Sequence, residues 1–182
     1  MSKKLFSLLL LVFFFSYSVL LADESTILPT AKKLVGFIRF KKNDQAIALI
    51  DTKTFSKNLL LNHWDKIDPK DQLEFEEAMK EYIKNKSFPI ALQYFDKIDI
   101  NYEKAKVKGK EAELPASILY KGSEKITFSW IFTETNGKFL VSDFLLAEGK
   151  LASEVNRVKQ IEPTYEKKGM KELIALIKKA SK

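Results

Sequence analysis

The sequence has no cysteine and only one histidine, His63. A disulfide framework and a thiolate metal site are therefore excluded, and so is any metal site built from several histidines. Arginine is also scarce, because Arg39 and Arg157 are the only two and lysine supplies the rest of the basic charge. Nucleic-acid-binding proteins usually use arginine for bidentate contacts with bases and phosphates. The lysine-rich composition therefore indicates a solubilising surface and predicts no nucleic-acid partner.

Motifs for common catalytic sites are missing as well. The sequence contains no phosphate-binding glycine loop, no metal-binding motif and no nucleophile elbow. A Ser–His–Asp arrangement would have to use His63, which lies beside Trp64 at the end of an expected helix. We interpret His63 as a partly exposed capping residue. The sequence predicts a binding protein rather than an enzyme, without a cofactor or a metal.

Residues 1–22 have the layout of a secretory signal peptide. Lys3 and Lys4 form a positive start, an apolar stretch follows from Leu5 to Phe15, and Ala22 offers a small residue for cleavage. The alternative is an uncleaved anchor, since the apolar stretch could nearly span a bilayer. Cleavage would lower the net charge from +7 to about +5. It would leave residues 23–182 as one domain in the periplasm.

The first half of the mature chain has the periodicity of helices. Apolar residues recur at helical spacing over 31–38, 46–50, 55–64 and 75–83. Asp51 or Thr52 can cap the third of these helices, and Asp68-Pro69 gives the fourth an N-cap acceptor followed by proline. Helical spacing returns after Gly149. Pro163 is expected to break it, Pro89 to mark a break or a new turn, and Gly169 to precede the last helix, 170–179.

From Lys97 onward the periodicity changes to that of strands. Four alternating runs cover 98–102, 114–120, 126–132 and 139–146. Asn136-Gly137 predicts a type I′ hairpin, because both residues tolerate positive φ. Pro115 is expected at a sheet edge or a bulge. The sequence predicts an α+β fold, with helices packed on one face of a curved, mainly antiparallel four-stranded sheet.

Apolar residues of the sheet and of the neighbouring helices are the candidate lining of a ligand pocket. Phe128, Trp130 and Phe132 should share one strand face, and Phe139, Val141 and Asp143 should share one on the next strand. An interior of this kind, with few polar groups, is typical of a lipid site. Ordinary core packing is the alternative. The candidate lining residues are Phe55, Leu59, Trp64, Phe75, Met79, Tyr82, Ile118, Phe128, Trp130, Phe132, Phe139 and Val141.

Asp143 is the one acid within an otherwise apolar strand. A buried carboxylate is costly unless hydrogen bonds satisfy it, so Asp143 should have donor partners. One interpretation is a general base in a cone-shaped pocket. We favour a structural acid, because no second polar group lies in register with it.

Several motifs between Asp51 and Lys179 together resemble the MlaC family, the toluene-tolerance auxiliary proteins of ABC transport systems. Each motif is short, and their order and spacing carry the resemblance. They are Leu61-Asn62-His63-Trp64, Asp68-Pro69-Lys70-Asp71-Gln72, the strand from Gly137 to Asp143, Glu148-Gly149 followed by Arg157, and the ending from Lys168 to Ile174. Phe139 stands where the family usually has tryptophan, and Lys150-Leu151 replaces its usual residues after the glycine.

The resemblance implies an NTF2-like or MlaC-like fold and a soluble periplasmic carrier of phospholipid. Such a carrier exchanges its cargo with an outer-membrane lipoprotein complex and an inner-membrane ABC transporter that has an MCE-domain subunit. Two alternatives remain open from the residues alone. One is a periplasmic adaptor domain that docks a partner without lipid, and the other is an NTF2-like enzyme that uses Asp143.

Overall fold

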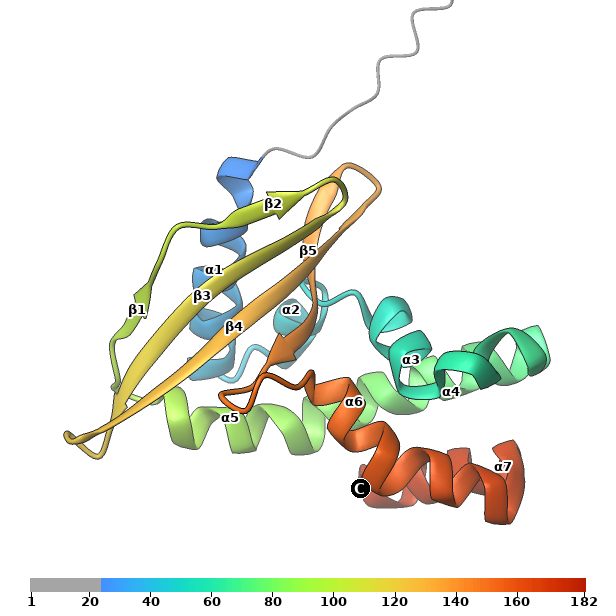
Figure 1. Ribbon diagram of the computed structural model, residues 1–182. Helices are drawn as coiled ribbons and strands as arrows, with labels where there is room; N and C mark the ends of the chain where they lie inside the picture. The colour runs from blue at the N-terminus through green and yellow to red at the C-terminus, as the bar shows by residue number, and fades with distance from the viewer. Residues whose placement is uncertain (1–23) are drawn as a thin grey trace, which may run out of the picture.

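The computed structural model describes residues 24–182, so the expected signal peptide at residues 1–22 lies outside the described part of the chain. Helices begin and end this part, and strands lie between them (Figure 1). The helical elements before the strands are η1 (Glu24–Thr26), α1 (Ile27–Arg39), α2 (Asn43–Ile47), α3 (Thr52–Leu60), η2 (Leu61–Lys66), α4 (Pro69–Tyr82), η3 (Ile83–Ser87) and α5 (Phe88–Phe95). Those after the strands are α6 (Ala152–Asn156), η4 (Arg157–Ile161) and α7 (Glu162–Ala180). Within residues 24–182, no helix combines the length and apolarity that crossing a bilayer requires.

Two aspartates start helices as the sequence predicts. Asp51 caps α3, where its carboxylate accepts a hydrogen bond from the Thr54 amide at 2.9 Å. Asp68 caps α4 in the same way, accepting from the Lys70 amide at 2.8 Å, with Pro69 as the first helical residue. These bonds satisfy amides that have no partner within the helix.

One antiparallel sheet contains all five strands of residues 24–182. They are β1 (Ile100–Tyr102), β2 (Lys106–Lys108), β3 (Glu111–Tyr120), β4 (Glu124–Thr135) and β5 (Lys138–Leu145), in the order β1-β3-β4-β5, with β2 also paired to β3. The prediction of four strands is wrong by one, because β2 forms between the predicted strands 98–102 and 114–120. Pro115 lies between the β3 residues that pair with β1 and those that pair with β2. Strand β3 also pairs with β4 in an unbroken register that includes Pro115, so the predicted position at a sheet edge or a bulge is wrong.

The β4–β5 hairpin confirms the type I′ turn. Asn136 and Gly137 have φ values of 52° and 75°, and Thr135 pairs with Lys138 on either side of them. Positive φ at both central residues twists the turn in the sense that antiparallel strands require.

A β-bulge then shifts the register of these two strands. Phe132 pairs with Val141, whereas Ile131 pairs with Asp143, so Ser142 is the extra residue on β5. A bulge of this kind reverses which residues of the bulged strand face a given side.

The bulge moves Asp143 to the other face of the sheet. Phe144 now shares a face with Trp130, and their ring centroids lie 4.5 Å apart. The prediction that Asp143 shares a face with Phe139 and Val141 is therefore wrong. The prediction assumes strict alternation along the strand, but one inserted residue reverses the face of every residue after it.

Two π-helical turns interrupt the long helices without ending them. The η3 turn connects α4 to α5 just before Pro89, and η4 connects α6 to α7 just before Pro163. The predicted break at Pro163 is therefore wrong. The wider π turn changes the hydrogen-bond pattern, so the bond that Pro163 cannot donate is not required. The proline ring also avoids a clash with the carbonyl of the preceding turn. The chain bends instead at Gly169, whose φ of 76° is non-helical.

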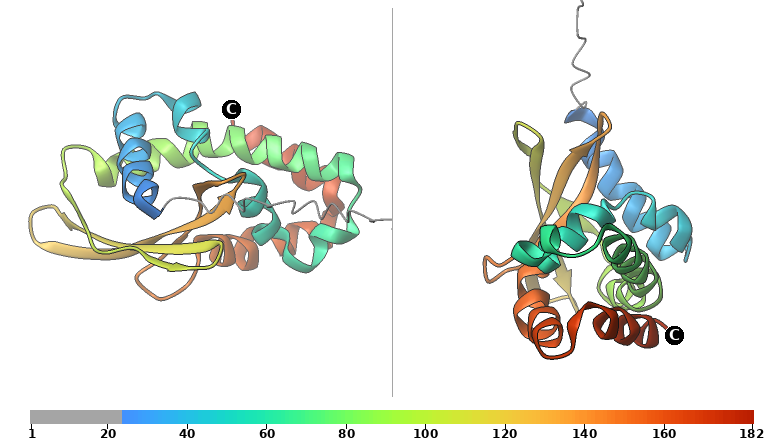
Figure 2. Two further views of the ribbon diagram at one scale, coloured as in Figure 1. Left: turned by 90° about the horizontal axis from the view of Figure 1, so that it is seen from above. Right: turned by 90° about the vertical axis from the view of Figure 1, so that its right-hand side faces the viewer.

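Buried apolar residues form two separate clusters. Helices α1 and α5 lie on one face of the sheet (Figures 1 and 2). The first cluster, here called the sheet cluster, lies between them and the sheet. The second, here called the helix cluster, lies among α3, α4 and α7. The sheet cluster includes Ile27, Leu34, Ile38, Phe88, Phe95, Leu114, Trp130, Phe132, Phe139 and Val141. The helix cluster includes Leu59, Leu60, Trp64, Phe75, Met79, Ile161, Met170, Leu173, Ile174 and Ile177.

Candidate functional site

A cavity of about 660 Å³ lies between the two clusters, and we call it the main cavity. Helices α3, α4, α5 and α7 form its walls together with the sheet and the α6–η4 segment. Its volume falls within the range typical of pockets for small molecules. Because residues of both clusters border it, the main cavity is a gap between two packed regions and not a defect within either one.

The wall of the main cavity is almost entirely apolar. None of the described residues that line it carries a charge. The lining comprises Phe55, Leu59, Met79, Tyr82, Ile83, Ser87, Ile90, Ala91, Tyr94, Phe95, Ile118, Ile126, Phe128, Phe144, Leu146, Ala152, Asn156, Gln160, Ile161, Thr164, Leu173, Leu176, Ile177 and Ala180. Such a wall suits a hydrocarbon chain, since apolar surface gains free energy when it leaves water and no wall group requires an ionic partner.

The main cavity opens to solvent between α5 and the α6–η4 segment. Ile90 and Tyr94 of α5 line the cavity and are 55% and 40% exposed. Asn156 and Gln160 line the opposite side and are exposed as well. The polar side chains of Asn156 and Gln160 therefore lie where the cavity meets water. A ligand with an apolar body and a polar end would fit with the polar end at this mouth.

A second, smaller cavity of about 200 Å³ adjoins the first and reaches towards α1. The two cavities share wall residues on α3, α5 and β5, including Phe55, Ala91, Phe95 and Phe144. The second cavity thus extends the apolar space beyond the main cavity.

Half of the predicted pocket residues lie on the wall of the main cavity. These are Phe55, Leu59, Met79, Tyr82, Ile118 and Phe128. Val141 lines the smaller cavity, which Phe55 also borders. The remaining five line neither cavity: Trp130, Phe132 and Phe139 are buried in the sheet cluster, and Trp64 and Phe75 are buried in the helix cluster.

Sequence reasoning missed the cavity walls made by α5 and α7. Ile90, Ala91 and Tyr94 come from α5, and Leu173 and Leu176 come from α7. The sequence predicts the last helix but only a break or a new turn at Pro89, and periodicity does not tell which side chains fill a core and which border a cavity. One signal was available, because Ile90 and Tyr94 add apolar surface to a helix whose other face already has Phe88 and Phe95.

Asp143 is buried and has donors for both carboxylate oxygens. Its Oδ1 accepts from the amides of Phe144 at 2.8 Å and Ser153 at 3.1 Å, and the Ser153 hydroxyl donates to Oδ2. Burial raises the pKa of the Asp143 carboxyl, and hydrogen bonds from Ser153 and Phe144 oppose this rise. Asp143 thereby fastens the start of α6 to β5, which fits the predicted structural acid.

His63 lies on η2, away from both cavities. Its Nε2 is 3.6 Å from Glu162 Oε1, and its ring contacts the Tyr165 ring with centroids 4.6 Å apart. The sequence predicts a partly exposed capping residue. The side chain is 23% exposed, but Leu61 and not His63 is the C-cap of α3, so the predicted capping role is wrong. Its neighbours come from α7, so His63 links the turn after α3 to that helix.

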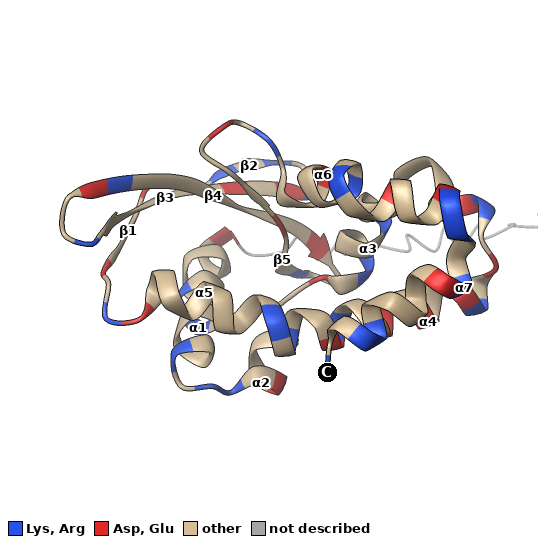
Figure 3. Ribbon diagram, turned by 90° about the horizontal axis from the view of Figure 1, so that it is seen from below, with Lys and Arg blue, Asp and Glu red and all other residues tan. Residues whose placement is uncertain are grey.

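Charged side chains are spread over the outer surface. Basic and acidic residues follow one another along α4 and α7, and others lie on the sheet (Figure 3). Ion pairs such as Lys80–Glu77 at 2.6 Å and Lys84–Asp44 at 2.7 Å join neighbouring elements or turns. Mixed charge of this kind favours solubility.

Comparisons with known proteins are consistent with this architecture. A solved structure titled a phospholipid-binding protein from Ralstonia solanacearum, in complex with a phospholipid, aligns with a TM-score of 0.70 and 12% identity. The alignment covers 88% of this chain and 97% of the other, and at this identity it shows a shared fold. No curated protein matches the chain. The model of the MlaC protein family matches residues 39–179, and the chain therefore belongs to the MlaC family.

Proposed function

We propose that this protein binds phospholipid and carries it through an aqueous compartment. The observation that carries the proposal is the main cavity, which is large, open at one side and free of charge among its described lining residues. Family membership and the phospholipid-binding neighbour support it. Both also suggest a binding protein rather than an enzyme.

The acyl chains would occupy the apolar space, and the head group would remain at the mouth. Each buried CH₂ group contributes about 0.8 kcal/mol, which offsets the cost of removing the lipid from a bilayer. A charged head group would be expensive to bury against a wall without a counter-charge. We therefore place it near Asn156 and Gln160, where the cavity meets solvent.

The finer proposal concerns the transport system. We infer that residues 1–22 direct the chain to the periplasm and that residues 23–182 form the lipid-binding domain. The partners would be an outer-membrane lipoprotein complex and an inner-membrane ABC transporter with an MCE-domain subunit. Membership of the MlaC family supports this assignment. Pull-down of the mature chain with each purified complex tests it, and failure to bind either one would contradict it.

Release of the lipid requires the cavity mouth to widen. The two π turns are the candidate hinges, because Ile83 and Ser87 of η3 and Gln160 and Ile161 of η4 line the main cavity. A π turn inside a helix is frequent at functional sites. Hydrogen exchange should be faster at η3 and η4 than in β3 and β4. Equal protection of these segments would exclude the hinge.

A cavity-filling variant tests lipid binding directly. Ala91 lines both cavities, so the side chain of Ala91→Trp would occupy space that the acyl chains need. Native mass spectrometry of the purified protein should show a phospholipid adduct, and Ala91→Trp should reduce its share by about tenfold or more.

Ala175→Trp is the matched control. Ala175 is exposed on α7 and lines neither cavity, so the added bulk should leave the adduct unchanged. Thermal unfolding checks that both variants are folded. If the unmodified protein carries no lipid and takes up none on incubation, the proposal is wrong and an adaptor that docks a partner through its apolar mouth becomes the better explanation.

A further inference from the structure

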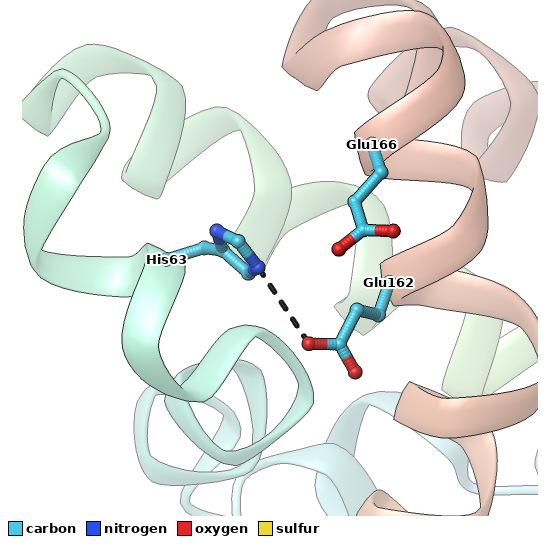
Figure 4. Close-up of side chains that lie close together, drawn as sticks. All are labelled: His63, Glu162 and Glu166. Carbon is cyan, nitrogen blue, oxygen red and sulfur yellow. Dashed lines mark ion pairs between the residues drawn. The ribbon is translucent and has the colours of Figure 1, made fainter.

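Three potential metal ligands converge between η2 and the start of α7 (Figure 4). They are a nitrogen of His63 and carboxylate oxygens of Glu162 and Glu166, all within 4.8 Å of one another. The closest pair, His63 Nε2 and Glu162 Oε1, is 3.6 Å apart. None of the three residues lines either cavity, so this cluster is separate from the proposed lipid site.

The local structure holds these side chains in place. Glu162 and Glu166 are four residues apart on α7, so they project from the same face of the helix. The Tyr165 ring lies against the His63 imidazole, which limits its rotation. Arg157 Nη1 is 3.4 Å from Glu162 Oε2, so the other oxygen of that carboxylate is directed at His63. An outer partner of this kind commonly orients a ligating carboxylate.

We propose that His63, Glu162 and Glu166 bind a zinc ion. One imidazole nitrogen and two carboxylate oxygens are ligands that Zn²⁺ accepts at about 2.0–2.2 Å, with tetrahedral geometry. Donor atoms around such an ion lie about 3.3 Å apart, so small side-chain rotations bring the observed arrangement to that geometry. Calcium and magnesium prefer sets made only of oxygen ligands, so the imidazole selects against them.

Charge supports the same assignment. The two carboxylates repel each other, and Arg157 neutralises one of them. A divalent cation would offset the remaining charge and bring Glu166, which is exposed, into the cluster. Water would complete the coordination at the solvent side. The site would fasten the turn after α3 to α7, two elements that flank the helix cluster.

An ordinary His63–Glu162 ion pair is the competing explanation. It would be weak at this exposure and would not involve Glu166. The variant Glu166→Gln separates the two explanations, because it leaves His63 and Glu162 unchanged. Glu172→Gln is the control, since Glu172 is also an exposed acid of α7 but lies outside the cluster.

Isothermal titration of the metal-free mature protein with zinc chloride tests the site. We expect one ion per chain, and affinity at least about tenfold weaker in Glu166→Gln and in His63→Gln but unchanged in Glu172→Gln. Zinc at about a hundred times Kd should raise Tm by roughly 5–10 °C, while magnesium should not. Absence of zinc binding, or equal affinity in Glu166→Gln and the unmodified protein, would overturn the assignment. The phospholipid adduct should persist in Glu166→Gln, so the zinc and lipid proposals can fail independently.

Discussion

Strand β4 contacts a filled region at one end and a hollow one at the other. Phe132 is fully buried in the sheet cluster, whereas Phe128, on the same strand and the same face, lines the main cavity. The two side chains are chemically identical. What differs is the opposing layer: the filled end packs against α1, while α5 and α7 leave a gap at the other end. Hydrophobic composition therefore does not determine whether a protein interior is filled.

An apolar hollow of this size lowers stability. Protein interiors normally pack as densely as organic crystals, and side chains that border a void lose contacts on that side. A chain selected only for stability would fill the gap with larger side chains at positions such as Ala91 and Ala152. A ligand that occupies the hollow restores these contacts and stabilises the folded state by mass action.

The largest expected effect comes from truncating the two phenylalanines in turn. Phe132→Ala removes a fully buried ring from a filled region, so it should lower the free energy of unfolding by about 3–5 kcal/mol. Phe128→Ala enlarges a cavity that already exists, so its cost should be roughly 1–2 kcal/mol. Urea denaturation of lipid-free protein measures both values.

The two variants also differ in their effect on lipid. Phe128→Ala should change the amount or the composition of bound phospholipid, because it alters the cavity wall, whereas Phe132→Ala should not when the protein is folded. Native mass spectrometry below the unfolding transition gives this comparison. Equal destabilisation by the two substitutions would show that side chains fill the main cavity in solution. The two ends of β4 would then be packed alike.

Asp143 of β5 is hydrogen-bonded to α6 and so links the two regions. Val141 of β5 belongs to the sheet cluster, and α6 lines the main cavity. Asp143→Ala leaves the amides of Phe144 and Ser153 without their acceptor, so it should cost about 2–3 kcal/mol. Asp143→Asn keeps one acceptor and should cost about 1 kcal/mol. Thermal unfolding of both variants measures the costs, and equal costs would show that these hydrogen bonds contribute little.

The contribution of Asp143 to the free energy of unfolding depends on pH, and the raised pKa sets the direction of that dependence. Burial raises the pKa of Asp143 in the folded protein above its unfolded value. The carboxyl group therefore contributes its full stability below the unfolded pKa and loses it as pH rises through the folded pKa. The stability advantage of the unmodified protein over Asp143→Asn should therefore shrink as pH rises above the ordinary pKa of an aspartate, about 4. An advantage that grows with pH would contradict the raised pKa.

Local signals in the sequence predicted much of the fold. Asn136-Gly137 and Asp68-Pro69 were read correctly because their conformations depend on a few adjacent residues. The sequence does not predict the bulge at Ser142, since nothing in the alternation marks an inserted residue. The same holds for the π turn before Pro163, where a wider turn accommodates a residue that normally ends a helix.

The wall of the main cavity is set by packing and not by local sequence. Patterns identify apolar faces, and six of the twelve proposed lining residues do border the main cavity. Trp130 and Phe75 have the same character but are covered by neighbouring elements. The distance between opposing layers decides which residues border a void, and that distance depends on contacts between segments far apart in the chain.

The smallest predicted effect concerns the start of α4, the helix that brings Met79 and Tyr82 to the main cavity. Asp68→Ala removes the acceptor for the Lys70 amide, so it should cost about 1 kcal/mol. Asp71→Ala is the control, because Asp71 lies in the first turn but only interacts with the helix dipole, at about 0.3 kcal/mol. Chemical denaturation gives both costs. Because Asp68 is far along the helix from the cavity residues, bound lipid should remain unchanged, and its loss would mean that the hollow region depends on the whole length of α4.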